Sequence, residues 1–190
     1  SKRAYLQRLR RQILLRAGRA AMIKKIFATV LLACVMGLLI SSMDIAESKI
    51  SVRHGNTDKQ PLQIEFGKYL CHESGTVIND LYNTAQAVMP NGDTYFFNDI
   101  ANVFMWLMRQ KNRDEIVVWV YSQDTEKYII AKDAWYSRVE ITPMGYGFGA
   151  YEFHNYGRSD YYYDEIVLCA ARGETLLNPL INILLSENKI

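Results

Sequence analysis

Three side chains in this sequence carry the donor atoms that a soft metal ion prefers. Cys71 offers a thiolate, His72 beside it offers an imidazole, and Met144 offers a thioether from a distant segment. Cu(I) favours sulfur ligands, so one cysteine, one histidine and one methionine are enough for a three-coordinate site. The cysteine is deprotonated when it binds the metal. These residues therefore predict a Cu(I) site assembled from two parts of the chain.

Met144 lies in a glycine-rich stretch that favours close approach to another segment. Residues 142–153 have the sequence TPMGYGFGAYEF, in which three glycines follow Pro143. Glycine adopts backbone conformations that other residues avoid, and proline restricts the backbone where the loop begins. We expect this loop to carry the Met144 thioether to the metal. His154 follows directly and is a weaker candidate for a further ligand, its alternative being an ordinary surface histidine.

The chain lacks the common catalytic motifs. It has no Gly-x-Ser-x-Gly, no His-Glu-x-x-His and no phosphate-binding glycine pattern. Cys71 has no Cys-x-x-Cys partner, which argues against thiol redox catalysis. The sequence therefore predicts a binding protein, not an enzyme.

The amino-terminal part of the chain differs sharply in charge from the rest. Residues 1–43 carry nine lysines and arginines and no acidic residue, whereas the remainder holds 13 basic and 20 acidic side chains. A domain with this excess of acidic side chains is a poor partner for nucleic acid, because phosphates bind to positively charged surfaces. Residues 26–43 are uncharged, and a helix of that length spans roughly 27 Å, close to the hydrocarbon core of a bilayer.

We therefore expect a membrane-tethered protein with an exported domain. Residues 1–25 are predicted to form a basic cytoplasmic arm and residues 26–43 a transmembrane anchor, which places the following domain on the exported side of the membrane. Alternatively, the protein starts at Met22, residues 1–21 are not native, and Met22–Cys34 is a lipoprotein signal with a lipidated Cys34. Both alternatives tether the domain to a membrane.

The elements that must position the ligands begin with strands. Residues 44–61 are polar and are predicted to be a linker. Leu62–Leu70 alternates apolar and polar side chains as a strand does, and Thr84–Met89 and Thr94–Phe97 flank a Pro-Asn-Gly-Asp turn typical of a hairpin. Three further strands, rich in β-branched and aromatic residues, are predicted at Glu115–Ser122, Lys127–Ala131 and Trp135–Ile141.

Helices follow these strands. Asn98 is predicted to cap a helix over Asp99–Lys111. Ser159 is predicted to cap a second helix over Asp160–Arg172, and residues 179–190 to form a C-terminal helix or tail that starts at a proline. The order of elements predicts an α+β domain of two small ββαβ-like units. The buried face of the first helix is predicted to contain Ile100, Val103, Phe104, Leu107 and Met108.

Two cysteines, Cys71 and Cys169, belong to the predicted exported domain. In an oxidising compartment they are able to form a disulfide. Cys169, however, lies in an apolar helical run, where a free cysteine usually acts as a small core residue. We therefore favour two free thiols.

Several motifs together resemble the NosL family of copper-delivery proteins across residues 62–178. The family has a Cys-Gly-Met-x-Ile/Val-x-Asp motif, then an Ala-Gln pair, a glycine turn, a Phe-Asp-Asp motif and later a Pro-Met-Gly loop. The residues of this chain that match are Gly75, Ile78, Asp80, Ala85, Gln86, Gly92, Phe97, Asp99, Asp124, Ala134, Pro143, Met144 and Gly145.

The resemblance implies a fold of two ββαβ units and delivery of Cu(I) to nitrous oxide reductase at the bacterial inner membrane. Ser74 and Thr76 occupy the positions of the family's cysteine and methionine. Two interpretations follow. Either the metal site has shifted to Cys71, His72 and Met144, or the chain is a metal-free accessory subunit of an inner-membrane complex.

Overall fold

The computed structural model describes residues 22, 26–37 and 49–190, and it divides the chain into two units, Ser1–Glu47 and Ser48–Ile190. In the first unit, residues 26–37 are helical. The rest of the predicted anchor, residues 38–43, and all of the predicted basic arm except Met22 lie outside the described residues. Within the described ranges, no helix is both long and apolar enough to cross a membrane.

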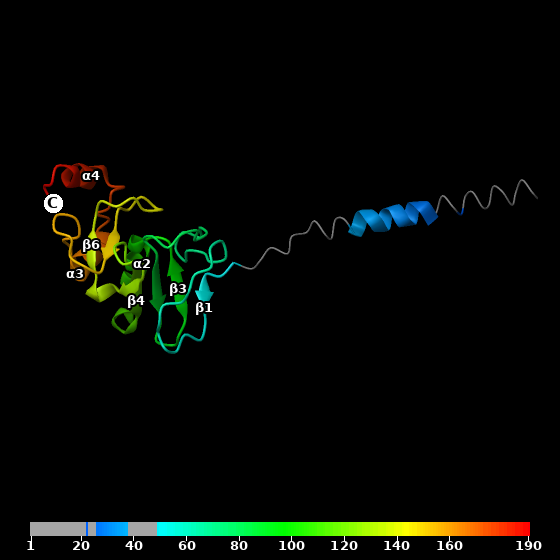
Figure 1. Ribbon diagram of the computed structural model, residues 1–190, viewed down its shortest axis with the longest axis horizontal. Helices are drawn as coiled ribbons and strands as arrows, with labels where there is room; N and C mark the ends of the chain where they lie inside the picture. Colours follow the sequence, from blue (N-terminus) through cyan, green and yellow to red (C-terminus); the bar gives the residue numbers. More distant parts are fainter. Residues whose placement is uncertain (1–21, 23–25, 38–48) are drawn as a thin grey trace, which may run out of the picture. The chain divides into compact units, whose positions relative to one another are not determined.

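A five-stranded antiparallel sheet forms one half of the second unit (Figure 1). The strand order is β1-β3-β2-β4-β5, and the predicted hairpin is confirmed as the pair β2–β3. Gly92 closes the hairpin turn with a φ of +85°, a conformation that favours glycine. The bounds are Val52–Arg53 for β1, Ala85–Val88 for β2, Thr94–Phe97 for β3, Val117–Tyr121 for β4 and Tyr128–Ile130 for β5.

The described part of the predicted linker belongs to the domain, which corrects the sequence-based boundary. Strand β1 pairs with β3, and Asn56 is buried with its side-chain amide donating to Gln60 and Thr94. The His54 side chain is exposed and pairs with Asp93 at 2.6 Å. Hydrogen bonds hold this segment in the domain. Its polar composition therefore did not indicate that part of it is buried.

The prediction of a strand over Leu62–Leu70 is wrong. The backbone of Leu62 pairs with the side-chain amide of Gln86, which accepts at 2.8 Å and donates at 2.7 Å. Gly67 then turns the chain with a φ of +80°. A buried amide side chain thus replaces a neighbouring strand. Leu62, Ile64 and Tyr69 pack in a second small core with Phe96, whereas Phe66 is exposed.

Helix α2 (Ile100–Met108) packs against strands β2 and β3 and contributes six buried residues to the main core. Its N-cap is Asp99, one residue later than predicted, and Asn98 is left free for other contacts. The predicted buried face is confirmed except at Met108, which is 37% exposed. Cys71 and Cys169 are both free and buried, as favoured from the sequence.

The second half of the domain contains a two-stranded sheet of β6 (Trp135–Ser137) and β7 (Gly149–Tyr151), followed by helices α3 (Tyr163–Ala171) and α4 (Pro179–Ser186). The α+β class is therefore confirmed. The first half of the domain has the predicted ββαβ order in β2, β3, α2 and β4. The second half does not, because β6, β7 and α3 are followed by helix α4 where the order requires a strand. Helix α3 starts later than predicted because Ser159 is buried in the preceding loop, where its hydroxyl accepts from Asn155.

Candidate functional site

The carboxylate of Asp99 joins the glycine-rich loop to the start of helix α2. One oxygen accepts from the amide of Ala101 at 3.0 Å, and the other accepts from the amide of Met144 at 3.2 Å. Burial raises the pKa of Asp99 to about 6, although hydrogen bonds from Thr142, Ala101 and Met144 favour the charged form. One side chain therefore caps the helix and positions the methionine.

The loop is folded tightly around Thr142. Its hydroxyl accepts from the amides of Tyr146 at 3.0 Å and Gly147 at 3.3 Å. Gly147 has a φ of +92°, and a Cβ atom there would lie 2.5 Å from the Leu176 side chain and 2.7 Å from the Arg138 carbonyl. A glycine is required at this position for both reasons.

The two predicted sulfur ligands contact a pair of asparagine side chains. The Cys71 sulfur is 3.6 Å from Nδ2 of Asn102, and the Met144 sulfur is 3.9 Å from Nδ2 of Asn98. The two amides are hydrogen bonded to each other at 3.2 Å. Cys71 is 1% exposed, whereas Met144 is partly exposed. The structure thus brings both sulfurs to the same end of helix α2.

The segment that resembles the family's first motif meets the same asparagines. Nδ2 of Asn98 donates to Oγ1 of Thr76 at 2.6 Å, and the Ser74 and Thr76 hydroxyls are 2.8 Å apart. Glu73 pairs with Arg109 at 2.6 Å and fixes the segment to the other end of α2. The first motif, the start of α2 and the glycine loop therefore converge on Asn98.

His72 lies beside Cys71 in sequence and is exposed, with its ring edge-on to aromatic side chains. The ring centroid is 4.7 Å from that of Tyr95 and 6.2 Å from those of Phe97 and Trp106. The backbone amide of His72 donates to Phe96 at 2.7 Å, which ties the segment to β3. The structure consequently orients this imidazole toward an aromatic cluster.

The contacts of His154 involve β6 and the loop before α3. Its ring stacks on Trp135 with 3.9 Å between centroids, Tyr156 approaches at the same distance, and Nε2 is 2.7 Å from the Asp160 carboxylate. These partners are not the proposed sulfur ligands, and the role of His154 as a further ligand stays a prediction.

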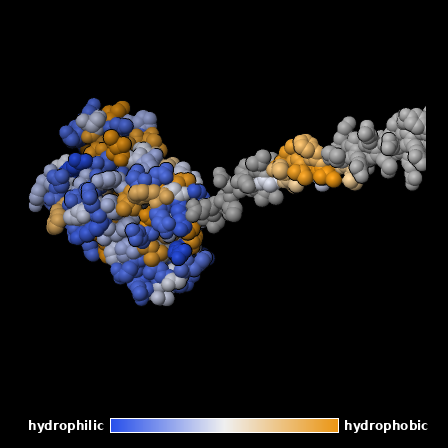
Figure 2. Space-filling view, turned by 45° about the vertical axis from the view of Figure 1, so that its right-hand side comes forward, coloured by the Kyte–Doolittle hydropathy of each residue, from blue (hydrophilic) through white to orange (hydrophobic). Residues whose placement is uncertain are grey.

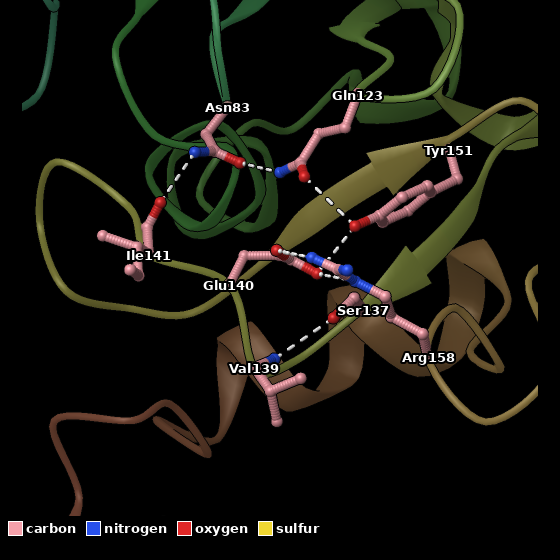
Figure 3. Close-up of polar contacts among 8 residues, drawn as sticks. All are labelled: Asn83, Gln123, Ser137, Val139, Glu140, Ile141, Tyr151 and Arg158. Atoms are coloured by element: carbon pink, nitrogen blue, oxygen red, sulfur yellow. Dashed lines mark hydrogen bonds and ion pairs between the residues drawn. The ribbon is translucent and has the colours of Figure 1, made fainter.

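A buried polar network fixes the chain just before the glycine loop (Figure 3). Glu140 accepts two hydrogen bonds from the Arg158 guanidinium, at 2.9 and 2.7 Å, and its Oε1 lies 2.7 Å from the Tyr151 hydroxyl. Burial raises the pKa of Glu140, but these hydrogen bonds outweigh it and the net pKa is lowered. The charged carboxylate thus joins the end of β6 to β7.

The same network continues toward the five-stranded sheet. Gln123 lies 3.1 Å from the Tyr151 hydroxyl and donates to Asn83 at 2.6 Å, and Asn83 donates to the Ile141 carbonyl at 3.1 Å (Figure 3). A Cβ atom on Gly149 would lie 2.5 Å from Cγ of Glu140. Gly149 is therefore needed because any larger residue in β7 would overlap the Glu140 side chain.

Asn102 is a polar residue inside an apolar helix, and this feature of the sequence could have indicated the asparagine pair. In the part of the chain that the structure describes, no three histidine, cysteine, aspartate or glutamate side chains are grouped to hold a metal ion. A metal at this end of α2 therefore depends on the Met144 thioether together with Cys71.

Comparison with known proteins finds no family model and no curated protein that matches the chain.

Proposed function

We propose that this protein is a NosL-like carrier that holds Cu(I) as cargo between Cys71 and Met144 and passes it to a client protein by ligand exchange. The observation that carries the proposal is that the two sulfurs contact two asparagine side chains that are hydrogen bonded to each other, Cys71 through Asn102 and Met144 through Asn98. A thiolate and a thioether are ligands that Cu(I) prefers and that few other biological cations select.

The arrangement of the matching motifs supports the family assignment within this proposal. Thr76, at the family's methionine position, contacts the same Asn98 that contacts Met144, and Ser74, at the family's cysteine position, is hydrogen bonded to Thr76. Asp99, from the Phe-Asp-Asp motif, holds the Pro-Met-Gly loop through the Met144 amide. The two-unit ββαβ fold of the family is proposed on the same basis, and β2 to β4 supply its first unit.

Copper uptake requires a local rearrangement, because Cys71 is 1% exposed. Cu(I) replaces the Asn102 amide at the Cys71 sulfur and the Asn98 amide at the Met144 sulfur. His72 completes the site when its ring turns away from Tyr95. A site with few ligands, one of them the weakly donating thioether of Met144, suits a protein that releases its metal to a client.

We further propose that residues 26–43 anchor the protein in the bacterial inner membrane with its domain in the periplasm, where a metalloenzyme such as nitrous oxide reductase is the client. Apolar side chains are exposed near the loop: Leu177 lies beside Gly145, and Leu180 and Ile183 follow on α4. Figure 2 shows hydrophobic residues gathered at this end of the domain, where α4 lies. Contact with this surface places a client next to Met144.

The test is a Cu(I) titration of the detergent-solubilised full chain in competition with a coloured Cu(I) chelator. We expect one Cu(I) per chain, and an affinity at least about tenfold lower in Cys71→Ser and Met144→Leu. Cys169→Ala and Met108→Leu are matched controls, because neither residue contacts the asparagine pair. Unchanged competition in both site variants rejects the carrier function.

A metal-free accessory subunit is the second candidate, and one observation favours it. The Ser74 and Thr76 hydroxyls already form hydrogen bonds where the family has sulfur ligands. Such a subunit retains no stoichiometric Cu(I) and instead copurifies in detergent with the other subunits of a membrane complex. Retention of one Cu(I) by the wild-type chain decides against it.

A further inference from the structure

An aromatic side chain is exposed at the edge of the domain where the chain enters it. Phe66 is 59% exposed. It lies in a tight turn, in which the Lys68 amide donates to the Glu65 carbonyl at 3.2 Å. Gly67 permits this turn through its φ of +80°, a conformation that favours glycine. Phe66 therefore contributes little to the core of the domain, and its ring is accessible to a partner.

The first described residue of the domain, Lys49, contacts this turn directly. Its ammonium group donates to the Gly67 carbonyl. Only residues 44–48 separate Lys49 from the proposed anchor, residues 26–43. A connection of that length reaches roughly 20 Å when it is fully extended. A bilayer spanned by the anchor is therefore within reach of the Phe66 turn.

This edge of the domain also differs from the rest in charge. Residues 49–70 carry four basic and two acidic side chains, whereas residues 71–190 carry nine basic and 16 acidic side chains. Two of the four basic residues, Lys49 and Lys68, lie at the Phe66 turn. Anionic lipids attract basic side chains near the bilayer surface and repel acidic ones. The edge next to the anchor is thus the part of the domain whose charge suits an anionic membrane.

We propose that the Phe66 turn docks on the anionic surface of the membrane that anchors the chain. The Phe66 ring inserts at the level of the lipid headgroups, and Lys49 and Lys68 face lipid phosphates. Glu65 pairs with Lys68 at 3.1 Å and reduces this attraction, so the ring supplies most of the binding. The inference rests on the anchoring part of the proposed function and is independent of copper binding.

Docking at this edge leaves the proposed client surface accessible. Helix α4 lies at the opposite end of the domain from β1, the strand that follows Lys49 (Figure 1). The short connection to the anchor makes the contact effectively intramolecular, so a single aromatic ring with two lysines is sufficient to maintain it. The membrane contact thereby holds the domain in one orientation above the bilayer.

The test uses the full chain reconstituted in vesicles of phosphatidylcholine and phosphatidylglycerol, with Phe66→Trp as the reporter. Bromine atoms on the lipid acyl chains quench a tryptophan that they contact. We expect brominated lipid to reduce the emission added by the new tryptophan, relative to wild type, at least about twofold. The reduction is expected to be smaller in phosphatidylcholine alone, because the lysines then lack anionic lipid.

Phe153→Trp is the matched control. Phe153 is 67% exposed, and its amide donates to the Asp124 carboxylate, so it lies in acidic surroundings. We expect brominated lipid to leave the emission added at this position unchanged. In the Phe66→Trp chain, Lys49→Gln is expected to weaken quenching in the mixed vesicles, whereas Lys189→Gln, at an exposed lysine near the C-terminus, is expected to have no effect.

Flotation of the vesicles distinguishes failure of the anchor from failure of the docking. A chain that does not float with the vesicles rejects the anchor and the docking together. A chain that floats but is quenched equally at positions 66 and 153 overturns the docking and leaves the anchor standing. Quenching at position 66 that is as strong without phosphatidylglycerol overturns the choice of an anionic surface.

Discussion

Asn98 and Asn102 lie side by side at the start of helix α2, with the Asn102 amide donating to the Asn98 oxygen at 3.2 Å. Each also donates to one sulfur, Asn102 to Cys71 and Asn98 to Met144. Two segments far apart in sequence are thereby connected through one amide pair. The predictions below test how this end of the domain is held together.

Replacing Asp99 with asparagine is expected to change the pH dependence of stability. Burial raises the folded pKa of Asp99 to about 6, above its unfolded value near 3.8. The folded state therefore binds a proton more readily than the unfolded state, and the contribution of Asp99 to stability falls as pH rises from about 4 to about 6. The full effect corresponds to roughly 3 kcal/mol.

Urea unfolding of wild-type protein and Asp99→Asn at pH 4, 5, 6 and 7 measures this effect. The free energy of unfolding of the wild type minus that of the variant is expected to decrease across this range. A difference that is flat or rises with pH contradicts the assignment. The asparagine also points an amide donor at the Met144 amide, so we expect the loop to be more readily cleaved by protease.

Gly147→Ala is expected to destabilise the domain more than Gly157→Ala. Both glycines have positive φ, +92° and +83°, which costs a substituted alanine about 1–2 kcal/mol. The Cβ at position 147 also overlaps Leu176 and the Arg138 carbonyl, whereas the space at position 157 is open. Overpacking adds about 1–3 kcal/mol. Equal midpoints of chemical unfolding in the two variants rule out this account of the loop.

Tyr151→Phe is expected to weaken the buried network around Glu140. Loss of a hydrogen bond to a charged, buried carboxylate costs about 1.5–3 kcal/mol. The lowered pKa of Glu140 means that its stabilisation is present above the unfolded pKa and is lost as pH falls. The effect of the variant on thermal unfolding is therefore greatest at neutral pH and smaller near pH 3.

Tyr156→Phe is the matched control for this prediction, because the Tyr156 side chain is 85% exposed. Its melting temperature is expected to equal that of the wild type. A Tyr151→Phe variant as stable as Tyr156→Phe at neutral pH disproves the role assigned to the network.

Cys71 and Cys169 are expected to react slowly with a thiol reagent in the folded protein. They are 1% and 8% exposed, and burial raises the pKa of Cys169, which lowers its thiolate fraction. In a Cys34→Ser background, two thiols are expected to be counted after unfolding without reductant. A count of zero indicates a disulfide between them and disagrees with the structure.

The local elements were largely predictable from the sequence, because local rules specify them. The Pro-Asn-Gly-Asp turn defined the β2–β3 hairpin, apolar spacing defined α2, and the predicted C-terminal helix starts at Pro179. The glycine-rich loop was recognisable for the same reason, since Gly147 adopts a backbone conformation that favours glycine.

Only the tertiary structure decided which side chains meet. Gln86 holds the backbone of Leu62 where a strand was expected, and Asn98 contacts Met144 instead of capping α2. His154 stacks on Trp135. Such contacts link residues that are distant in the chain, and local periodicity and composition carry no information about them. The residue types of the candidate site could therefore be predicted, and their grouping could not.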